Sequence, residues 1–330
     1  MKNQPNVAII GAGISGLSCA IELQRAGIST TVFDKSRGPG GRMSTRRGDG
    51  WQCDHGAQYF TARHPAFRAE LARWQAAGVA APWQPQLAVL GGLDNHHPDA
   101  GLERFVGTPR MTAPARFLAE GIDLYLEATV TGLIQEGEGW QLETRETGRT
   151  AASYDAVLLA VPAPQATPLL QPVAGHLAAL PAGAVMRGSW ALMLRYEQRP
   201  ALPFDAAFVN RGPLRWIARD SGKPGREGEE TWLLHATAEW SEAHIEDSPE
   251  AVADAPLAAF AELGAPAPAA WTAHRWRYAD SAPALAHEYA WDGALRLGLC
   301  GDWLNGGKVE GAWLGGRALA QRVVADFATG

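Results

Sequence analysis

The stretch that decides the fold of this chain is Asn6-Val-Ala-Ile-Ile-Gly-Ala-Gly-Ile-Ser-Gly-Leu17. Residues 7–10 form a short apolar run in front of a glycine, which predicts a buried strand. Residues 11–16 follow the pattern G-x-G-x-x-G, and apolar residues then recur at helical spacing until Gly27 ends the predicted helix. A second strand, predicted over residues 30–33, ends at Asp34. This order of strand, glycine-rich turn, helix and acid-terminated strand predicts a dinucleotide-binding unit.

Each glycine of this motif has a distinct expected role. Gly11 permits the tight turn, and Gly13 has no side chain, so a pyrophosphate can approach its backbone. Gly16 allows the helix to pack closely on the strand. The free N–H groups at the helix start attract an anion, and Asp34 is expected to accept hydrogen bonds from a ribose. A strand-turn-helix without any ligand is the alternative interpretation.

The overall composition limits the size and the partners of the protein. Its 330 residues predict about two domains, and 46% hydrophobic residues allow a sizeable core. The net charge is -6 without a basic block, so we expect neither nucleic acid nor an anionic membrane as a partner. No run approaches the roughly 20 apolar residues of a membrane span. Cys19, Cys53 and Cys300 are too widely spaced for a disulfide framework or a metal site, and they favour a reducing cytoplasm.

Several features allow two interpretations from the residues alone. The loop Lys35-Ser-Arg-Gly-Pro-Gly-Gly-Arg42 suits a diphosphate, but it also fits a solvated basic loop. Gly16-Leu-Ser-Cys19 loosely matches a lipoprotein signal, yet polar residues follow at once, so we expect no export. The pair His96-His97 lies among turn-forming residues, which favours a turn over a metal site. Thirteen tryptophans are available for the core or for a pocket that takes a planar ring.

The rest of the chain has the pattern of a second, different sheet. Thr112 resembles the capping residue of a short helix, and residues 123–144 and 155–162 alternate or run apolar as strands do. From about residue 183, strand-like segments separated by Gly, Pro and charged turns predict an antiparallel sheet with helical cover. Residues 294–303 form a last strand leading into Gly301-Asp302, and a long helix is predicted up to about Phe327.

Three of these segments together resemble a known family. The G-x-G-x-x-G with Asp34, the Gly40-Gly-Arg42 loop, and Gly301-Asp302 before Glu310-Gly-Ala are similar to the FAD-binding signature of the flavin amine-oxidase superfamily. More narrowly, the resemblance is to bacterial renalases and covers nearly the whole chain. It rests on residues 33–43, His55-Gly-Ala-Gln-Tyr-Phe-Thr61, 234–240, His274-Arg-Trp276, 300–303 and 309–316.

The resemblance implies an α/β fold in two domains. One is a Rossmann-like FAD-binding domain with a mixed sheet, assembled from residues 1–62, 109–182 and 290–330. The other is an antiparallel-sheet substrate domain of residues 63–108 and 183–289. The cofactor implied is noncovalent FAD. Renalases oxidise 2- or 6-dihydro isomers of NAD(P)H to NAD(P)+ by hydride transfer to the flavin, and they reduce O2 to H2O2.

The resemblance also implies a set of cofactor-binding residues. The first part of the chain would hold the ADP and pyrophosphate, Val130 would approach the adenine side, Asp302 the ribityl or pyrophosphate, and the start of the last helix the isoalloxazine. The residues expected to bind the cofactor are Gly11, Ala12, Gly13, Ser15, Gly16, Asp34, Lys35, Gly41, Arg42, Gln58, Val130, Asp302, Val309, Glu310, Gly311 and Ala312.

The substrate pocket is expected to contain Gln58, Tyr59, His235 and Trp276. Each of them also has a structural interpretation, because a Tyr or His on a strand is commonly packed in the core. The cofactor takes the hydride, so the protein has to hold two flat rings together and exclude water. Two other functions stay open, namely a flavin amine oxidase or desaturase of a small amine or polyene, and a non-catalytic FAD- or NAD(P)-binding regulatory protein.

Overall fold

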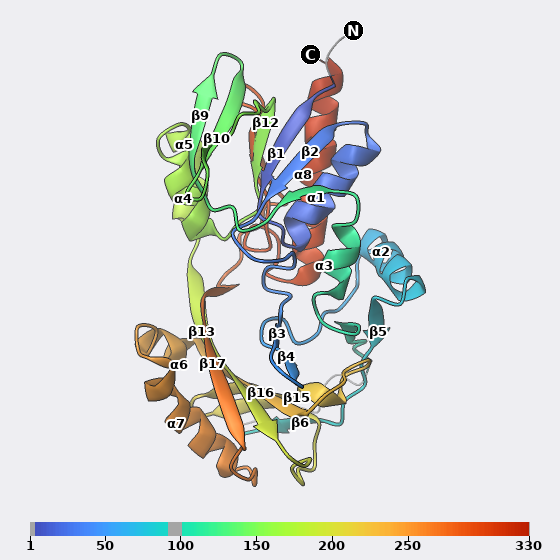
Figure 1. The fold of residues 1–330 in the computed structure, drawn as a ribbon, viewed down its shortest axis with the longest axis vertical. Coiled ribbons are helices and arrows are strands. Elements are labelled where there is room, and N and C mark those ends of the chain that lie inside the picture. The colour runs from blue at the N-terminus through green and yellow to red at the C-terminus, as the bar shows by residue number, and fades with distance from the viewer. Residues whose placement is uncertain (1–3, 92–100, 330) are drawn as a thin grey trace.

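The computed structural model describes residues 4–91 and 101–329. Figure 1 shows two lobes, one above the other, with the long strands β13 (Met186–Tyr196) and β17 (Ala270–Ser281) running from the middle into the lower lobe. Both ends of the described chain lie at the top of the upper lobe. The pair His96-His97 lies outside the described residues.

The upper lobe is built on a six-stranded sheet whose strands come from distant parts of the chain. Its order is β18 (Ala290–Asp292), β19 (Leu297–Leu299), β12 (Ala156–Leu159), β1 (Asn6–Ile10), β2 (Ser29–Phe33) and β8 (Asp123–Tyr125). All neighbours are parallel except β18 and β19, so the sheet is mixed, as predicted. The carboxyl ends of β1 and β2 therefore meet at one edge, where ligands bind in open α/β sheets.

Successive residues of β1 point to opposite faces of this sheet, and each face has its own cover. Val7 and Ile9 pack in one cluster with α1 (Ile14–Arg25) and α8 (Val309–Thr329). Ala8 and Ile10 belong to a second cluster, formed with a three-stranded sheet and two helices. These elements are β9 (Val130–Glu136), β10 (Gly139–Thr144), β11 (Gly148–Arg149), α4 (Ala163–Leu170) and α5 (Gly175–Ala182).

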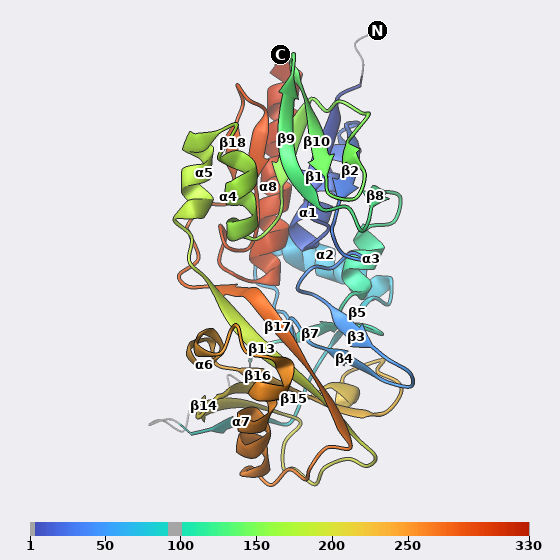
Figure 2. The ribbon, with the colours of Figure 1, turned by 60° about the vertical axis from the view of Figure 1, so that its left-hand side comes forward.

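The lower lobe contains a second six-stranded sheet in the order β17, β13, β16 (Glu230–Ala236), β15 (Leu214–Arg219), β14 (Ala206–Arg211) and β6 (Leu87–Leu90). Helix α7 (Pro249–Ala261) covers its outer face through Phe260, which packs with Leu192 and Leu234. Helix α6 (Ala238–Ala243) lies beside β13 (Figure 2). The sheet is antiparallel except at one edge, where β6 runs parallel to β14. This pair differs from the predicted pattern because β6 comes from an earlier part of the chain and no hairpin joins the two strands.

Short elements connect the two lobes. They are β3 (Thr45–Arg47), β4 (Gln52–Asp54), α2 (Pro65–Ala76), β5 (Ala80–Pro82), β7 (Phe105–Gly107), α3 (Ala113–Leu118) and the 3-10 turn η1 (Asp220–Gly222). Thr112 is the N-cap of α3, as predicted, but its backbone angles are helical and its side chain makes no capping hydrogen bond. No helix in the described part of the chain is long and apolar enough to cross a bilayer. The predicted domain boundaries stay a proposal.

Candidate active site

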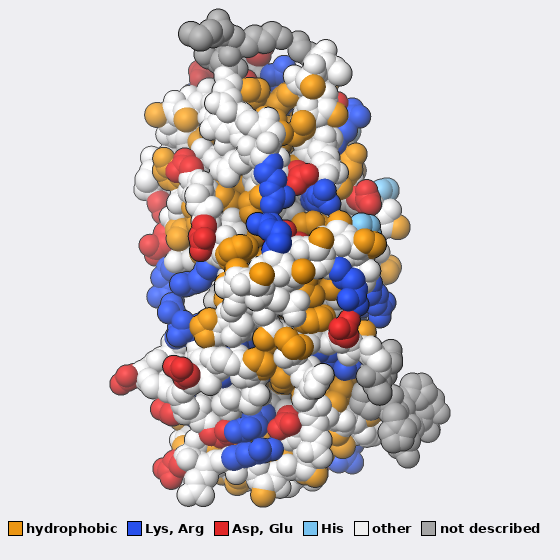
Figure 3. All heavy atoms as spheres, turned by 90° about the vertical axis from the view of Figure 1, so that its right-hand side faces the viewer, with side chains coloured by type: hydrophobic (Ala, Val, Ile, Leu, Met, Phe, Trp, Pro, Cys, Tyr) orange, Lys and Arg blue, Asp and Glu red, His pale blue; other side chains and the backbone are white. Residues whose placement is uncertain are grey.

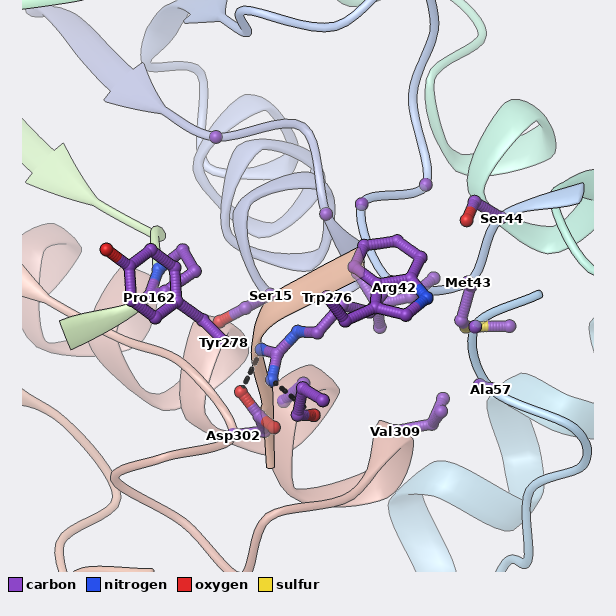
Figure 4. Close-up of a pocket in the computed structure, with 18 of the residues that line it drawn as sticks. Ser15, Arg42, Met43, Ser44, Ala57, Pro162, Trp276, Tyr278, Asp302 and Val309 are labelled. Atoms are coloured by element: carbon purple, nitrogen blue, oxygen red, sulfur yellow. Dashed lines mark hydrogen bonds and ion pairs between the residues drawn. The ribbon is translucent and has the colours of Figure 1, made fainter. Parts of the chain in front are cut away.

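A cavity of about 2340 Å³ lies between the two lobes. Its walls come from the β1–α1 turn, the loop after β2, the β3–β4 hairpin, the inner face of the lower sheet and the start of α8. Sites for one small molecule usually measure about 300–1,000 Å³. The volume is therefore sufficient for two ligands side by side. Figure 4 shows part of this cavity, with Ser15, Arg42, Trp276, Asp302 and Val309 around it.

The three motif glycines meet different surroundings. A Cβ on Gly11 would lie 2.5 Å from the Ala160 oxygen, and one on Gly16 would lie 2.0 Å from the Gly11 oxygen, so packing requires both glycines. Gly13 lines the cavity, and a Cβ there would meet nothing within 4 Å. Across from it, a Cβ on Gly41 would lie 3.4 Å from the Gly13 Cα. Gly13 and Gly41 thus form a narrow cradle open to the cavity at the start of α1, the position that suits an anion.

Asp34 ties this turn to the loop that follows β2. Its carboxylate accepts from the Ala12 N–H and from the Ser36 N–H, both at 2.7 Å. Asp34 and the exposed Lys35 line the cavity, as does Val130 at the start of β9. Ala12 is fully buried and, like Gly16, is not among the lining residues. These two residues belong to the scaffold of the turn.

Two segments that are 260 residues apart in the sequence meet at an ion pair between Arg42 and Asp302 (Figure 4). Arg42 also donates to the Ala279 oxygen on β17 at 3.4 Å. Both side chains line the cavity below the cradle. The pair therefore joins the glycine-rich loop, the end of β19 and the lower sheet at one point.

The start of α8 contributes Val309, Glu310 and Ala312 to the cavity wall. Gly311 does not line the cavity, and a Cβ on it would lie 1.7 Å from the Asn305 oxygen. The Glu310 carboxylate accepts from the backbone N–H groups of Arg63 and His64 at 2.8 and 2.6 Å. Glu310 thus connects the start of α8 to the segment before α2 through two hydrogen bonds, a structural role that the sequence did not predict.

A wall of flat rings faces the cavity from the β4–α2 loop and β17. The His55 and Trp276 rings stack at 5.2 Å, and the His274 ring stands edge-on to both, at 4.7 and 4.6 Å. The His55 carbonyl accepts from Trp276 Nε1 at 2.8 Å, and His235 Nε2 lies 3.0 Å from it. All four side chains line the cavity. The structure therefore brings two of the predicted pocket residues, His235 and Trp276, together with two histidines that were not predicted.

The three histidines of this wall are uncharged at neutral pH. Burial lowers the pKa of His55 to about 3 and the pKa values of His235 and His274 to about 4. The Arg46 guanidinium lies 3.0 Å from His274 Nδ1 and is the second cause of the low His274 pKa. A neutral imidazole accepts the Arg46 hydrogen through Nδ1, so its proton sits on Nε2.

Gln58 lines the cavity, but its amide is fully engaged with the protein. Nε2 donates to the Asp54 oxygen at 2.7 Å and to the Gly56 oxygen at 3.1 Å, and Oε1 accepts from Lys223 Nζ at 3.2 Å. A flipped amide would set NH2 against the ammonium group, so this orientation is fixed. Gln58 therefore shapes the wall and has no free donor for a substrate.

Behind Gln58 lies a cluster of four ionisable side chains without solvent exposure, Asp54, Asp220, Lys223 and Arg226. Lys223 Nζ is 2.7 Å from Asp220 and 3.2 Å from Asp54, and Arg226 is 2.5 Å from Asp54. Burial raises the pKa of Asp54, but the charges of Lys223 and Arg226 outweigh it and bring that pKa to about 2. Burial, followed by the Asp54 charge, raises the pKa of Asp220 to about 6. We call this group the buried ion cluster.

Tyr59 lies farther along the cavity among other aromatic rings. Its ring centroid is 5.6 Å from that of Trp216 and 6.3 Å from that of Trp83. The Arg104 guanidinium stacks over the Tyr59 ring at 5.4 Å. The prediction of a tryptophan-lined pocket thus applies to Trp216, Trp276 and Trp303, which all line the cavity.

Positive charge dominates the cavity. Among the described residues that line it there are twelve Lys and Arg side chains and four carboxylates. Groups of Lys and Arg side chains are visible around the middle of the molecule in Figure 3. Because the whole chain carries a net charge of -6, this local excess favours anionic ligands.

Comparison with known proteins identifies the family. A model of an NAD(P)-binding Rossmann-like domain matches residues 9–74, and the model of flavin containing amine oxidoreductases matches residues 71–324. The chain belongs to the family of flavin containing amine oxidoreductases. This confirms the predicted fold and superfamily. The family consists of flavin-containing oxidoreductases, which agrees with the predicted enzyme class of FAD-dependent oxidoreductase.

Individual relatives share only part of their length with this chain. A tRNA 5-methylaminomethyl-2-thiouridine biosynthesis bifunctional protein of Magnetococcus marinus is 29% identical over 226 residues, which cover 54% of this chain and 33% of that protein. An L-amino-acid oxidase of Daboia russelii is 36% identical over 75 residues, or 22% of this chain and 15% of the oxidase. The chain thus matches a third or less of the length of these curated relatives.

Solved structures share the whole fold at low identity. Cyclohexylamine oxidase from Brevibacterium oxydans superposes with a TM-score of 0.75 at 15% identity, covering 98% of this chain and 100% of that one. Putrescine oxidase bound to putrescine gives a TM-score of 0.71 at 15% identity, with 99% of each chain covered. These similarities establish the fold alone.

Proposed function

We propose that this protein is an FAD-dependent oxidase of the renalase type, which oxidises 2- and 6-dihydro isomers of NAD(P)H to NAD(P)+ and reduces O2 to H2O2. The excess of twelve cations over four carboxylates in a 2340 Å³ cavity is the observation that carries the proposal. The diphosphate of FAD offsets only part of this charge, and a second diphosphate in the substrate would offset more. A cationic amine would meet electrostatic repulsion in the same cavity.

The residues around the cradle fit FAD. Gly13 and Gly41 leave room for a pyrophosphate at the start of α1, and Asp34 keeps free lone pairs for a ribose. Arg42, Asp302 and the start of α8 would hold the remaining part of the cofactor. When bound, FAD supplies the hydride acceptor and the path of electrons to oxygen. None of the described lining residues is a cysteine, which supports noncovalent binding, and the three cysteines are buried and free, which fits the cytoplasm.

The neutral ring wall suits a dihydronicotinamide. Oxidation turns an uncharged dihydropyridine into a pyridinium cation, and protonated histidines beside it would oppose this change. The low pKa values of His55, His235 and His274 keep the wall uncharged at neutral pH. The indole face of Trp276 is in addition an attractive surface for a cation. The wall is thus matched to the charge that develops on the substrate.

Anaerobic mixing of the FAD-loaded protein with candidate substrates tests the proposal. We expect 2- or 6-dihydroNAD(P) to bleach the yellow flavin absorbance, whereas ordinary 4-dihydro NADH, putrescine and cyclohexylamine leave it unchanged. If amines bleach the flavin rapidly and the dihydro isomers do not, the proposal is wrong and the protein is an amine oxidase. A flavin that none of these compounds reduces would point to a non-catalytic binding protein.

Substitution of Asp302 by alanine is expected to weaken FAD binding by about tenfold or more, because hydrogen bonds to charged groups contribute about 1.5–3 kcal/mol and Arg42 would lose its anchor. The measurement is the flavin-to-protein ratio after gel filtration. Asp247→Ala removes an exposed carboxylate outside the cavity and serves as the control. Full flavin occupancy in Asp302→Ala would contradict the assigned role.

A further inference from the structure

Two imidazoles of the ring wall lie in one row across the lower sheet. His274 on β17 pairs with Ala191 on β13, and Ala191 pairs with His235 on β16. Directly paired residues on neighbouring strands point to the same face of a sheet. Both histidines line the cavity, and the fully buried Ala191 has no side chain large enough to separate them. The row therefore presents both imidazoles to the same part of the cavity, from strands about 10 Å apart.

Contacts with the protein fix opposite hydrogen-bond roles for the two rings. Burial keeps the pKa values of both histidines at about 4, so both rings are neutral at pH 7. Arg46 can only donate, so His274 Nδ1, at 3.0 Å from the guanidinium, accepts and the ring proton is on Nε2. The His55 carbonyl can only accept, so His235 Nε2, at 3.0 Å from it, donates and Nδ1 keeps a free lone pair.

The second nitrogen of each ring is accessible to a ligand. Within the described chain, His274 Nε2 and His235 Nδ1 form no hydrogen bond, and neither atom is buried, in contrast to His55 Nδ1. Polar groups inside a protein are normally hydrogen-bonded, so these two nitrogens need water or a ligand as a partner. The cavity wall therefore offers one fixed donor, His274 Nε2, and one fixed acceptor, His235 Nδ1.

This donor and acceptor lie beside the cofactor end of the cavity. His274 and Trp276 are separated by one residue on β17, so they face the same side of the sheet about 7 Å apart. An atom added at Gly56 would collide with the Arg42 carbonyl and would lie 3.4 Å from the Trp276 ring. Trp276 is therefore next to the loop that carries Arg42 (Figure 4). A flat ring bound by the two histidines would thus lie at the end of the cavity where the reaction is expected.

We propose that His274 and His235 recognise the primary carboxamide of the dihydronicotinamide, with His274 Nε2 donating to the carboxamide oxygen and His235 Nδ1 accepting from its NH2 group. This inference rests on the proposed function and adds to it the residues that select and orient the reacting ring. A carboxamide with a hydrogen bond of about 2.9 Å on each side spans up to about 8 Å. This size suits side chains from strands about 10 Å apart. A protonated amine has donors only, so it leaves the His274 N–H unpaired.

Two variants and three dinucleotides test the two contacts separately. The probes are NAD+, thionicotinamide adenine dinucleotide, whose sulfur is a weak acceptor, and 3-acetylpyridine adenine dinucleotide, which has a methyl group in place of the NH2. Calorimetric titration of the oxidised, FAD-loaded protein measures their dissociation constants. His274→Phe should weaken binding of NAD+ and the acetylpyridine analogue about tenfold and leave the thio analogue nearly unchanged. His235→Phe should weaken binding of NAD+ and the thio analogue about tenfold and leave the acetylpyridine analogue nearly unchanged.

His176→Phe is the control, because it removes an exposed imidazole outside the cavity. It should leave all three dissociation constants unchanged. Equal weakening of the three probes in either histidine variant of the ring wall would indicate a general disturbance of the pocket and would overturn the inference. A wild-type protein that binds NAD+ no better than the two analogues would overturn it as well, and this comparison needs no variant.

The binding measurements separate this inference from the proposed function. If the dihydro isomers do not reduce the flavin but each histidine variant weakens its own pair of probes, the carboxamide site stands and the proposed reaction is wrong. If the isomers reduce the flavin and the variants do not distinguish the probes, the reaction stands and the carboxamide site is wrong.

Discussion

Replacing Lys223 with methionine is expected to lower the free energy of unfolding at pH 7 by about 3–5 kcal/mol, the usual cost of removing one partner from a buried ionic group. The Lys223 side chain is fully buried, donates to Asp54 and Gln58, and forms an ion pair with Asp220 at 2.7 Å. Without it, two buried carboxylates share Arg226, which is 2.5 Å from Asp54 and 4.0 Å from Asp220. Urea unfolding of the purified variant measures the loss.

The same variant has a predictable dependence on pH. Burial and the Asp54 charge raise the pKa of Asp220 to about 6 in the folded protein, against about 3.9 in an unfolded chain. The ionised form of Asp220 therefore costs stability increasingly as the pH rises from about 4 through 6. Removing Lys223 raises this pKa further, so the difference between variant and wild type should be smaller at pH 5 than at pH 7. A difference that does not change between these pH values would contradict the explanation.

Two further variants serve as controls for Lys223→Met. The double variant Lys223→Met with Asp220→Asn removes one charge of each sign and keeps the Asp54–Arg226 pair, so it should regain most of the lost stability. Arg68→Met breaks an ion pair with Glu103 in which both side chains are about half exposed. Exposed pairs contribute about 0–1 kcal/mol, so this change should be small.

Sequence patterns predict this fold best where a local pattern determines local structure. The apolar run, the glycine motif and the helical spacing after Ile14 correctly predicted β1, α1 and β2. These elements depend on neighbours in the sequence, and their patterns are visible without the fold. The parallel pairing of β6 with β14 was not predicted, because it joins segments more than 100 residues apart and leaves no periodic signal.

In the candidate site, too, the locally encoded parts were predicted and the parts that depend on long-range contacts were not. The motif residues that form the cradle were predicted from spacing, but the buried ion cluster was not. Its Asp220–Arg226 segment contains Gly, Pro and charged residues, a composition typical of an exposed turn. The fold nevertheless buries the ionisable side chains of this segment, and Asp54, far away in sequence, supplies a negative charge beside Lys223 and Arg226. His55 and His274 lie in segments already noted as similar to renalases, so that similarity was a usable signal for the ring wall.

Two glycines of the nucleotide motif, Gly13 and Gly16, are expected to respond to substitution in opposite ways. Gly13→Val is expected to leave the cofactor-free protein folded, since the Gly13 backbone angles of -77° and 175° suit any residue. Valine is disfavoured relative to glycine at the capping position of a helix, so we expect a loss of about 1 kcal/mol. The added side chain would enter the open cradle beside Gly41. FAD affinity should then fall by well over tenfold, because the pyrophosphate loses its close approach to the backbone.

Gly16→Ala is the matched variant with the opposite expected outcome. Its Cβ would lie 2.0 Å from the Gly11 oxygen and 3.1 Å from the Ala160 side chain, so α1 must move off β1. Overpacking of this kind costs about 1–3 kcal/mol, so here the cofactor-free protein itself loses stability. Urea unfolding without FAD and flavin titration of the folded protein measure the two effects separately. Normal FAD binding in Gly13→Val would show that the pyrophosphate does not lie in the cradle. No other expected effect of the substitution would compensate for a loss of FAD affinity of this size.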